Sequence, residues 1–168
     1  MKLNIKYFIA IFSTIVLDQW SKILAVEHLK GKPGFDLLGG FVRFDYAENP
    51  GAFLSLGADL SDTARYWILT IAVAAVLLWC VYALFFTAQF KKAGGLTLSF
   101  IVGGGLSNLI DRAFRDGGRV IDYVQMGFAS LKTGIFNVAD MAITFGVIWM
   151  LIQSFRAPRE TAQSKKVS

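Results

Sequence analysis

Four apolar stretches of membrane-spanning length constrain the fold of this chain more than any other feature of its sequence. They lie at about residues 7–26, 66–86, 96–112 and 136–155. An α-helix rises about 1.5 Å per residue, so about 20 apolar residues cross the hydrocarbon core of a bilayer. The stretch 66–86 carries no charged residue, whereas polar residues interrupt the other three. We therefore predict an integral membrane all-α protein with four transmembrane helices.

The composition agrees with a membrane location. Of the 168 residues 55% are hydrophobic and only 17% are charged, and the mean hydropathy is +0.52. These values lie outside the range of ordinary soluble domains. Because Lys2 and Lys6 precede the first apolar stretch, a cleaved signal peptide is an alternative for it. Asp18 interrupts that stretch and no cleavage site of small residues follows, which favours a retained span.

The distribution of basic residues predicts the orientation in the membrane. Basic residues predominate at both termini and in the connection between the second and third spans, where Glu160 is the only acid. By the positive-inside rule, both termini are cytoplasmic and the segments at about 27–65 and 113–135 are extracytoplasmic. The basic residues concerned are Lys2, Lys6, Lys91, Lys92, Arg156, Arg159, Lys165 and Lys166.

This layout predicts one membrane domain, residues 1–157, and a mobile cytoplasmic tail, residues 158–168. The net charge of +5 is explained by the topology, because the basic residues do not form one patch with exposed aromatic residues. We therefore do not expect a nucleic-acid partner.

The first extracytoplasmic segment contains signals for a small β-sheet and a short helix. Val42, Phe44 and Tyr46 alternate with polar residues, which predicts a strand at 41–46. Residues 35–38 are its expected partner, with the sequence LGG as the turn. Ser61 is suited to cap either a short extracytoplasmic helix or the second span itself.

The residues that usually bind metals are too few for a metal site. Cys80 is the only cysteine and His28 the only histidine, so neither a disulfide framework nor a cluster of metal ligands is expected. Cys80 lies within an apolar run and is interpreted as a small buried hydrophobic residue. The glycine-rich sequence GGGLSN lacks the Lys-Ser/Thr of a phosphate-binding loop. We expect neither a metal nor a cofactor.

Several polar residues lie inside the predicted spans, where they are costly unless they have partners or a function. Asp18 and Lys22 are four residues apart and can pair on one helix face, which favours a structural role over a catalytic one. Gly104, Asn108 and Arg112 also recur every four residues and share one helical stripe. In that stripe the glycine allows close packing, the asparagine can bond across helices, and the arginine can reach an outer carboxylate or phosphate.

Two aspartates on the predicted outer side are the candidate catalytic groups. Asp140 follows Asn137 by three residues at the start of the last span, where the helix dipole alone would also favour an acid. Asp122 lies in RVIDYV, where it could instead be an ordinary loop residue. If the two carboxylates converge, they can share one proton and supply an acid and a base together. Their spacing in the sequence does not establish that they converge.

Five short sequences, in order along the chain, carry a resemblance to a known family. They are LDQWSK in the first span, ENPGAFLS in the first outer segment, GGGLSNLIDR in the third span, RVIDYV, and FNVADMAITFG in the fourth span. With these sequences the chain resembles lipoprotein signal peptidase, the type II signal peptidase of bacteria, over nearly all its length.

The resemblance implies a metal-free aspartic endopeptidase of the bacterial cytoplasmic (inner) membrane, with its active site on the extracytoplasmic side. Such an enzyme removes the signal peptide from diacylglyceryl-modified prolipoproteins immediately before the lipidated cysteine, and the antibiotic globomycin inhibits it. Asp122 and Asp140 match the catalytic pair of the family. Positions that line the substrate and inhibitor pocket are matched by Asn49, Gly51, Gly104, Asn108, Arg112, Asn137 and Ala139. Supporting polar positions are matched by Asp18, Lys22 and Asp111.

The resemblance further implies an outer sheet and short helix within about residues 35–64, membrane lipids as neighbours, and a monomer. The chain departs from the family pattern at two places. The usual N-x-G-A-A-[FW] reads NPGAFL, with Pro50 and Phe53, and Ser107 stands where the family usually has glycine before the asparagine. Neither change removes a catalytic group.

Two other functions are compatible with polar residues in a membrane. A proton-coupled transporter or channel subunit would place its carboxylates at mid-membrane and commonly contains an internal repeat. We find no such repeat, and both candidate aspartates lie near one predicted membrane edge. A non-catalytic assembly subunit would tolerate loss of the aspartates as long as its packing survived.

Overall fold

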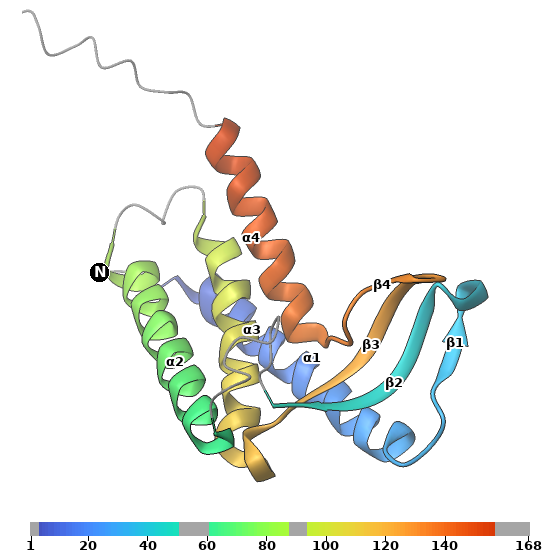
Figure 1. Ribbon diagram of the computed structural model, residues 1–168. Helices are drawn as coiled ribbons and strands as arrows, with labels where there is room; N and C mark the ends of the chain where they lie inside the picture. Colours follow the sequence, from blue (N-terminus) through green and yellow to red (C-terminus); the bar gives the residue numbers. More distant parts are fainter. Residues whose placement is uncertain (1–3, 51–60, 88–93, 157–168) are drawn as a thin grey trace, which may run out of the picture.

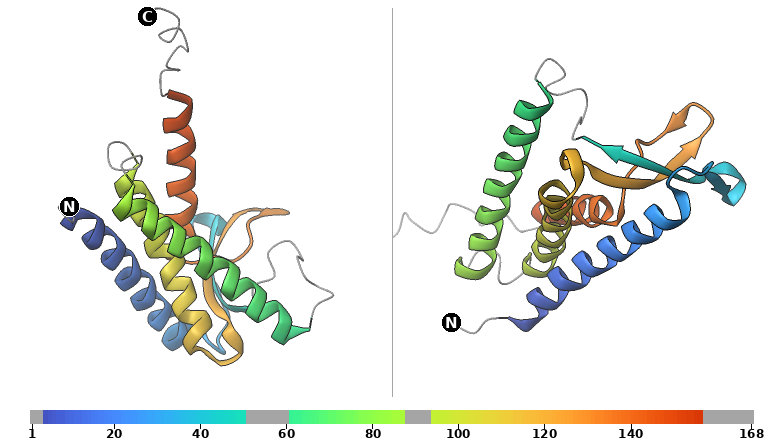
Figure 2. Two further views of the ribbon diagram at one scale, coloured as in Figure 1. Left: turned by 90° about the vertical axis from the view of Figure 1, so that its left-hand side faces the viewer. Right: turned by 90° about the horizontal axis from the view of Figure 1, so that it is seen from below.

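The protein is mostly helical, with a small antiparallel sheet on one side of the helices (Figures 1 and 2). The structure is a computed structural model that describes residues 4–50, 61–87 and 94–156. The helices are α1 (Ile5–Leu29), α2 (Asp62–Phe86), α3 (Gly95–Phe114) and α4 (Val138–Arg156), with short 3-10 turns η1 (Leu38–Gly40) and η2 (Asp116–Gly118). The strands are β1 (Phe35–Leu37), β2 (Val42–Asn49), β3 (Val120–Phe128) and β4 (Leu131–Lys132).

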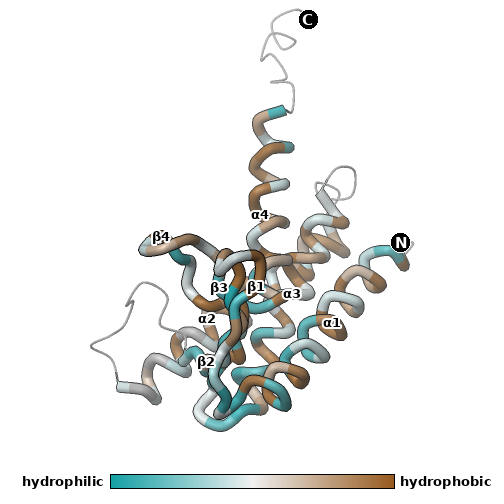
Figure 3. The backbone as a smooth tube through the Cα atoms, turned by 90° about the vertical axis from the view of Figure 1, so that its right-hand side faces the viewer, coloured by the Kyte–Doolittle hydropathy of each residue, from teal (hydrophilic) through white to brown (hydrophobic). Residues whose placement is uncertain are grey.

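Within the described residues, three helices are long and apolar enough to cross a membrane: α1, α2 over residues 66–86, and α4. Figure 3, which colours the backbone by hydropathy, shows many apolar residues along α1 and α4. The fourth helix, α3, is not among them, so the predicted count of four spans stays a prediction. The helices also begin or end a few residues from the predicted spans, as expected from sequence patterns alone.

Helix α3 is the centre of the helical part and contacts each of the other three helices. The glycines at 103–105 explain how three neighbours can approach it. A Cβ on the first would lie 2.8 Å from Thr14 Cβ of α1, and one on the second would lie 2.5 Å from the carbonyl oxygen of Ala139 in α4. One on the third would overlap Leu77 of α2. Since successive helical residues point about 100° apart, three adjacent glycines open α3 on three sides.

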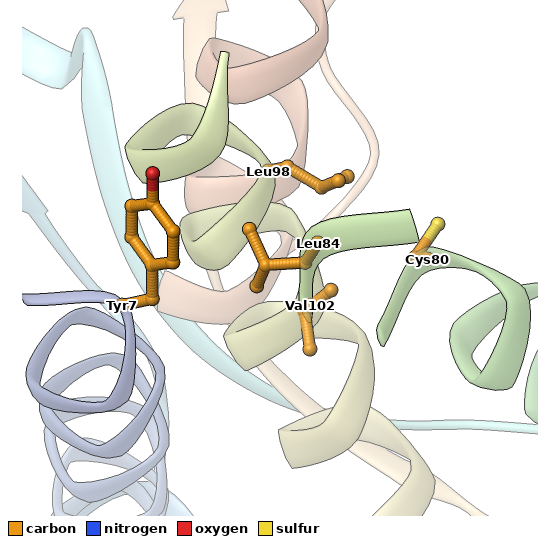
Figure 4. Packing of buried hydrophobic residues seen from close by; sticks show 5 residues of the cluster. All are labelled: Tyr7, Cys80, Leu84, Leu98 and Val102. Carbon is orange, nitrogen blue, oxygen red and sulfur yellow. The ribbon is translucent and has the colours of Figure 1, made fainter. Parts of the chain in front are cut away.

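An apolar cluster fixes α1, α2 and α3 at the end of the bundle away from the sheet. The side chains shown in Figure 4 come from all three helices and are buried. Cys80 is one of them, which confirms its interpretation as a small buried hydrophobic residue. The cluster consists of Tyr7, Cys80, Leu84, Leu98 and Val102.

The sheet has the order β1-β2-β3-β4, and all of its strand pairs are antiparallel. The predicted hairpin is confirmed: Phe35 pairs with Phe44, and Leu38 and the two glycines after it adopt positive φ in the turn. Strand β3 was not predicted, because we expected only a connection at 113–135. It pairs with β2 in a register that places Ala47 opposite Asp122. Asp122 therefore lies on a strand and not in a loop.

The sheet is anchored on the last turns of α1. Ala25 and Leu29 pack against Ile121 and Tyr123 of β3. The Tyr123 hydroxyl also donates to Ser21 Oγ at 2.7 Å. These contacts fix the position of β3, and with it Asp122, relative to the helices.

Ser61 caps α2 itself, since its hydroxyl accepts from the backbone N–H of Ala64 at 3.3 Å. A short extracytoplasmic helix was also expected within about residues 35–64. Residues 51–60 of that range lie outside the described residues, as does the tail at 158–168.

Candidate active site

Asp122 is almost completely buried, with 2% of its surface exposed. Asn137 Nδ2 donates to Asp122 Oδ1 at 2.7 Å, and Asn49 Nδ2 donates to Asp122 Oδ2 at 2.9 Å. The pKa of Asp122 is raised to about 6, mainly by burial, with the amide of Asn49 acting in the opposite direction and the negative charge of Asp140 contributing to the rise. Asp122 can therefore exchange a proton close to neutral pH.

Asp140 lies in the first turn of α4, where it forms a reciprocal cap with Asn137. Asp140 Oδ2 accepts from the backbone N–H of Asn137 at 3.2 Å, and Asn137 Oδ1 accepts from the backbone N–H of Asp140 at 2.9 Å. Asn108 Nδ2 of α3 donates to Asp140 Oδ1 at 2.8 Å. The helix N-terminus thus favours this acid, as the dipole argument predicted, but the carboxylate also bonds to a second helix.

Asn137 brings the two aspartates into one site. Its side chain donates to Asp122 while its backbone N–H donates to Asp140. The same side-chain nitrogen lies 3.2 Å from Asn108 Oδ1 and 3.2 Å from the carbonyl oxygen of Ile121. Two carboxylates from a strand and a helix therefore share one neighbour and influence each other's charge.

Lys22, a completely buried lysine, lies next to this site. Lys22 Nζ is 2.6 Å from Asp18 Oδ2, 2.8 Å from Asp111 Oδ2 and 2.8 Å from Asn108 Oδ1. An ammonium group has three hydrogens, so each of these acceptors can receive one. The predicted pairing of Asp18 with Lys22 is confirmed, and Asp111 provides a second carboxylate for the same cation.

Lys22 also fixes which way the Asn108 amide points. Asn108 Oδ1 receives hydrogens from both Lys22 and Asn137, so this end of the amide must be the oxygen. The nitrogen end then faces Asp140 as a donor. A buried cation on α1 thereby orients a donor on α3 toward a carboxylate on α4.

The two buried carboxylates that bind Lys22 also bond to the elements that carry the aspartate pair. Asp18 Oδ1 accepts from the backbone N–H of Ala139 at 2.8 Å, immediately before Asp140. Asp111 Oδ2 accepts from the backbone N–H of Ile121 at 3.3 Å, immediately before Asp122. The cluster around Lys22 therefore holds the first turn of α4 and the start of β3 in place.

The remaining predicted site residues that the structure describes lie around the same pair. Arg112 Nη1 donates to the carbonyl oxygen of Asn108 at 3.3 Å, and its charge is near enough to both aspartates to interact with them. Gly104 packs against Ala139 at the first turn of α4. Gly51, also predicted for the site, lies outside the described residues.

Two further polar residues near the site were not among the predicted site residues. Gln19 Nε2 donates to Asp111 Oδ1 at 3.0 Å, and the Ser107 hydroxyl donates to Asp18 Oδ2 at 2.8 Å. Each is a polar residue inside an apolar predicted span, which was the signal that could have selected both.

The protein combines apolar helices with two carboxylates, one buried and one partly buried, where these helices meet a sheet. These features define a membrane protein with an enzyme-like site. Two solved structures agree with this class. Each is titled as a bacterial membrane enzyme, one determined at 2.3 Å and the other at 1.9 Å resolution, and both are 25% identical to this chain. Their TM-scores are 0.73 and 0.74, and the matches cover 96% and 89% of this chain and 93% and 92% of theirs.

The family described as signal peptidase (SPase) II matches residues 10–156. Similar relatives are the lipoprotein signal peptidases of Halalkalibacterium halodurans (30% identical, covering 95% of this chain and 97% of the relative) and Bacillus pumilus (31%, covering 94% and 97%). That of Rickettsia bellii is 29% identical, over 92% of this chain and 76% of its own length. The chain belongs to the signal peptidase II family, and this membership indicates a bacterial membrane protease.

The raised pKa of Asp122 leads to a prediction about stability. The folded protein holds this proton up to about pH 6, whereas an unfolded aspartate releases it near its ordinary pKa of 3.8. Folding stability should therefore fall as the pH rises from about 4 to about 7, by roughly 3 kcal/mol for a shift of this size. Asp122→Asn removes that dependence. As the pH rises over the same range, the free energy of unfolding of the variant should therefore increase by about this amount relative to that of wild type.

Melting temperatures of both proteins in detergent micelles between pH 4 and pH 8 measure this difference. Asp116→Asn, at an exposed aspartate in η2, is the control and should follow wild type across the range. Curves for Asp122→Asn and wild type that stay parallel would contradict the prediction.

Proposed function

We propose that this chain is an aspartic endopeptidase that removes the signal peptide from diacylglyceryl-modified prolipoproteins, cutting immediately before the lipidated cysteine. Membership of the signal peptidase II family supports the substrate class. The observation that carries the aspartic mechanism is the Asn137 bridge, which holds Asp122 and Asp140 in one site.

In the proposed reaction, the aspartate pair carries one proton between its two carboxyl groups. The ionised carboxylate takes a proton from a water molecule as the water oxygen attacks the scissile carbonyl carbon. The protonated carboxyl gives its proton to the carbonyl oxygen, so that a neutral tetrahedral diol forms. The carboxyl group that took the water proton then gives it to the peptide nitrogen, and the C–N bond breaks. The other carboxylate takes a proton from a diol hydroxyl, so the signal peptide leaves with a carboxyl end and the new amino terminus is released. A pKa of about 6 for Asp122 suits such exchange near neutral pH.

The protein is proposed to cross the bacterial cytoplasmic (inner) membrane four times, with both termini in the cytoplasm. The surroundings of α3 support its role as the fourth span, because α1, α2 and α4 all contact it. Such a helix can carry Asn108, Asp111 and Arg112 without presenting them to lipid. The sheet and the aspartate pair then lie at the extracytoplasmic end, where the lipidated cysteine of a substrate meets the bilayer surface.

The residues nearest the pair are proposed to contact substrate or a globomycin-type inhibitor, while the buried cluster around Lys22 supports them. Asn49 and Asn108 already donate to the two carboxylates, so a substrate would enter beside them. The enzyme is proposed to work as a monomer among membrane lipids and without a cofactor. The contact residues are Asn49, Gly51, Gly104, Asn108, Arg112, Asn137 and Ala139; the supporting residues are Asp18, Lys22 and Asp111.

A cleavage assay with the purified full-length protein tests the proposal. The substrates are one prolipoprotein in diacylglyceryl-modified and in unmodified form, each with and without globomycin. We expect cleavage of the modified form alone, a mature product that begins with the lipidated cysteine, and loss of cleavage with globomycin. Cleavage of neither form, or equal cleavage of both, would contradict the proposal.

A further inference from the structure

Ser107 is a completely buried residue of α3 whose hydroxyl reaches across to α1. Its Oγ lies 2.8 Å from Asp18 Oδ2 and 3.0 Å from Gln19 Nε2. The carboxylate of Asp18 can only accept and the amide nitrogen of Gln19 can only donate, so the direction of both bonds is determined. The single hydroxyl hydrogen of Ser107 goes to Asp18.

We propose that Ser107 is a positioning residue for the aspartate pair, acting through Asp18 on the first turn of α4. The inference rests on the proposed function, because it assigns Asp140 to catalysis. Ser107 does not contact either member of the pair in the hydrogen bonds of the described residues. Ser107 acts on the first turn of α4 through two successive hydrogen bonds.

The first link of that chain is the Asp18 carboxylate. Lys22 and Ser107 both bind Asp18 Oδ2, and this leaves Asp18 Oδ1 directed at the backbone N–H of Ala139. Without the hydroxyl, Oδ2 would be held by Lys22 alone, and the carboxylate could rotate about that one contact.

The second link is the bond from Ala139 to Asp18. The backbone N–H groups in the first turn of a helix have no partner within the helix, so another residue must satisfy them. Asp18 does so for Ala139 at 2.8 Å, and Asp140 is the next residue. If the Asp18 carboxylate were held less firmly, the first turn of α4 would be held less firmly too. The distance from Asp140 to Asp122 would then be less fixed.

A purely structural role for Ser107 predicts a different result, and α3 supplies a matched control. Ser99 is also completely buried on α3, but its hydroxyl donates to the carbonyl oxygen of Gly95 in the same helix, at 2.7 Å. Ser99→Ala removes the same atoms from the same helix without reaching Asp18. If Ser107 only fills space, the two alanine variants should behave alike.

The experiment compares Ser107→Ala, Ser99→Ala and wild type as full-length proteins in detergent micelles. The first measurement is amide hydrogen exchange in the peptide that contains Ala139. The second is kcat and KM for cleavage of a diacylglyceryl-modified prolipoprotein. The net effect of one hydrogen bond corresponds to about a two- to tenfold change in an equilibrium. We expect Ser107→Ala to speed the exchange and lower kcat by about that factor, with KM unchanged, and Ser99→Ala to do neither.

Unchanged exchange at the first turn of α4 in Ser107→Ala would overturn the inference, as would faster exchange with an unchanged kcat. If Ser107→Ala does not fold, Ser107→Cys takes its place, because a thiol has a similar shape but is a weak donor. Failure of the proposed function looks different: wild type itself would not cleave the modified substrate, while the exchange comparison would still report on the bond chain.

Discussion

Asp140→Asn and Asp122→Asn should each leave a folded protein that cleaves a diacylglyceryl-modified prolipoprotein at least about a thousandfold more slowly than wild type. An amide keeps the shape of the carboxyl group but can neither take a proton from water nor give one to a carbonyl. In Asp140→Asn the reciprocal cap with Asn137 also weakens, at a cost of about 1 kcal/mol.

The measurement is kcat/KM in micelles together with a melting curve and circular dichroism for each variant. Asp116→Asn, which changes an exposed carboxyl group in η2, should retain wild-type activity. The double variant should be no slower than either single variant, because the two groups act as a unit. Wild-type activity in either single variant would refute the catalytic pair.

Lys22→Met should destabilise the folded protein more than either aspartate substitution does. It removes the cation that lies 2.6 Å from Asp18 and 2.8 Å from Asp111, and all three side chains are fully buried. Breaking a buried ion pair by removing one partner typically costs about 3–5 kcal/mol, because an uncompensated charge remains. The Asn108 amide would also lose one of the two contacts that orient it toward Asp140.

Lys30→Met is the matched control, since Lys30 Nζ also lies 2.8 Å from a carboxylate, that of Glu48, but at an exposed site. Exposed ion pairs contribute little, so this variant should melt close to wild type. The yield of folded protein and the melting temperature are measured for both variants. Equal melting temperatures for Lys22→Met and Lys30→Met would show that the buried cluster is not what holds the site.

The parts of the structure that were predictable from the sequence are those set by local spacing. The predicted hairpin depends on the two-residue alternation around Phe44 and on three turn residues, and its pairing with Phe35 is observed. The Asp18–Lys22 ion pair follows from a separation of four residues on one helix. In each case, neighbours in the sequence decide the contact.

Strand β3 was missed for a physical reason. Alternating polarity indicates a strand only when one face meets water, and residues 120–124 of β3 are all buried. The segment therefore reads as a continuous apolar run around Asp122. Its pairing with β2 joins residues more than 70 positions apart, such as Ala47 and Asp122, and no local pattern determines that pairing.

The convergence of the site was not predictable from spacing either. The sequence offered Asp122, Asp140 and Asn137 as candidates, but the Asn137 bridge depends on how β3 and α4 pack together. Asp111 as the second carboxylate at Lys22 likewise required the packing of α1 against α3. Only the resemblance to a family grouped these residues before the structure did.

The three adjacent glycines of α3 limit how this protein can change in evolution. The glycines at 103–105 set how α3 faces its three neighbours, and Asn108 and Asp111 bind the polar groups only a turn or two later. Inserting or deleting one residue between them would turn the polar side chains by about 100° relative to the packed helices. Length variation among descendants of this chain should therefore be found in the connections, while this stretch of α3 keeps a fixed number of residues.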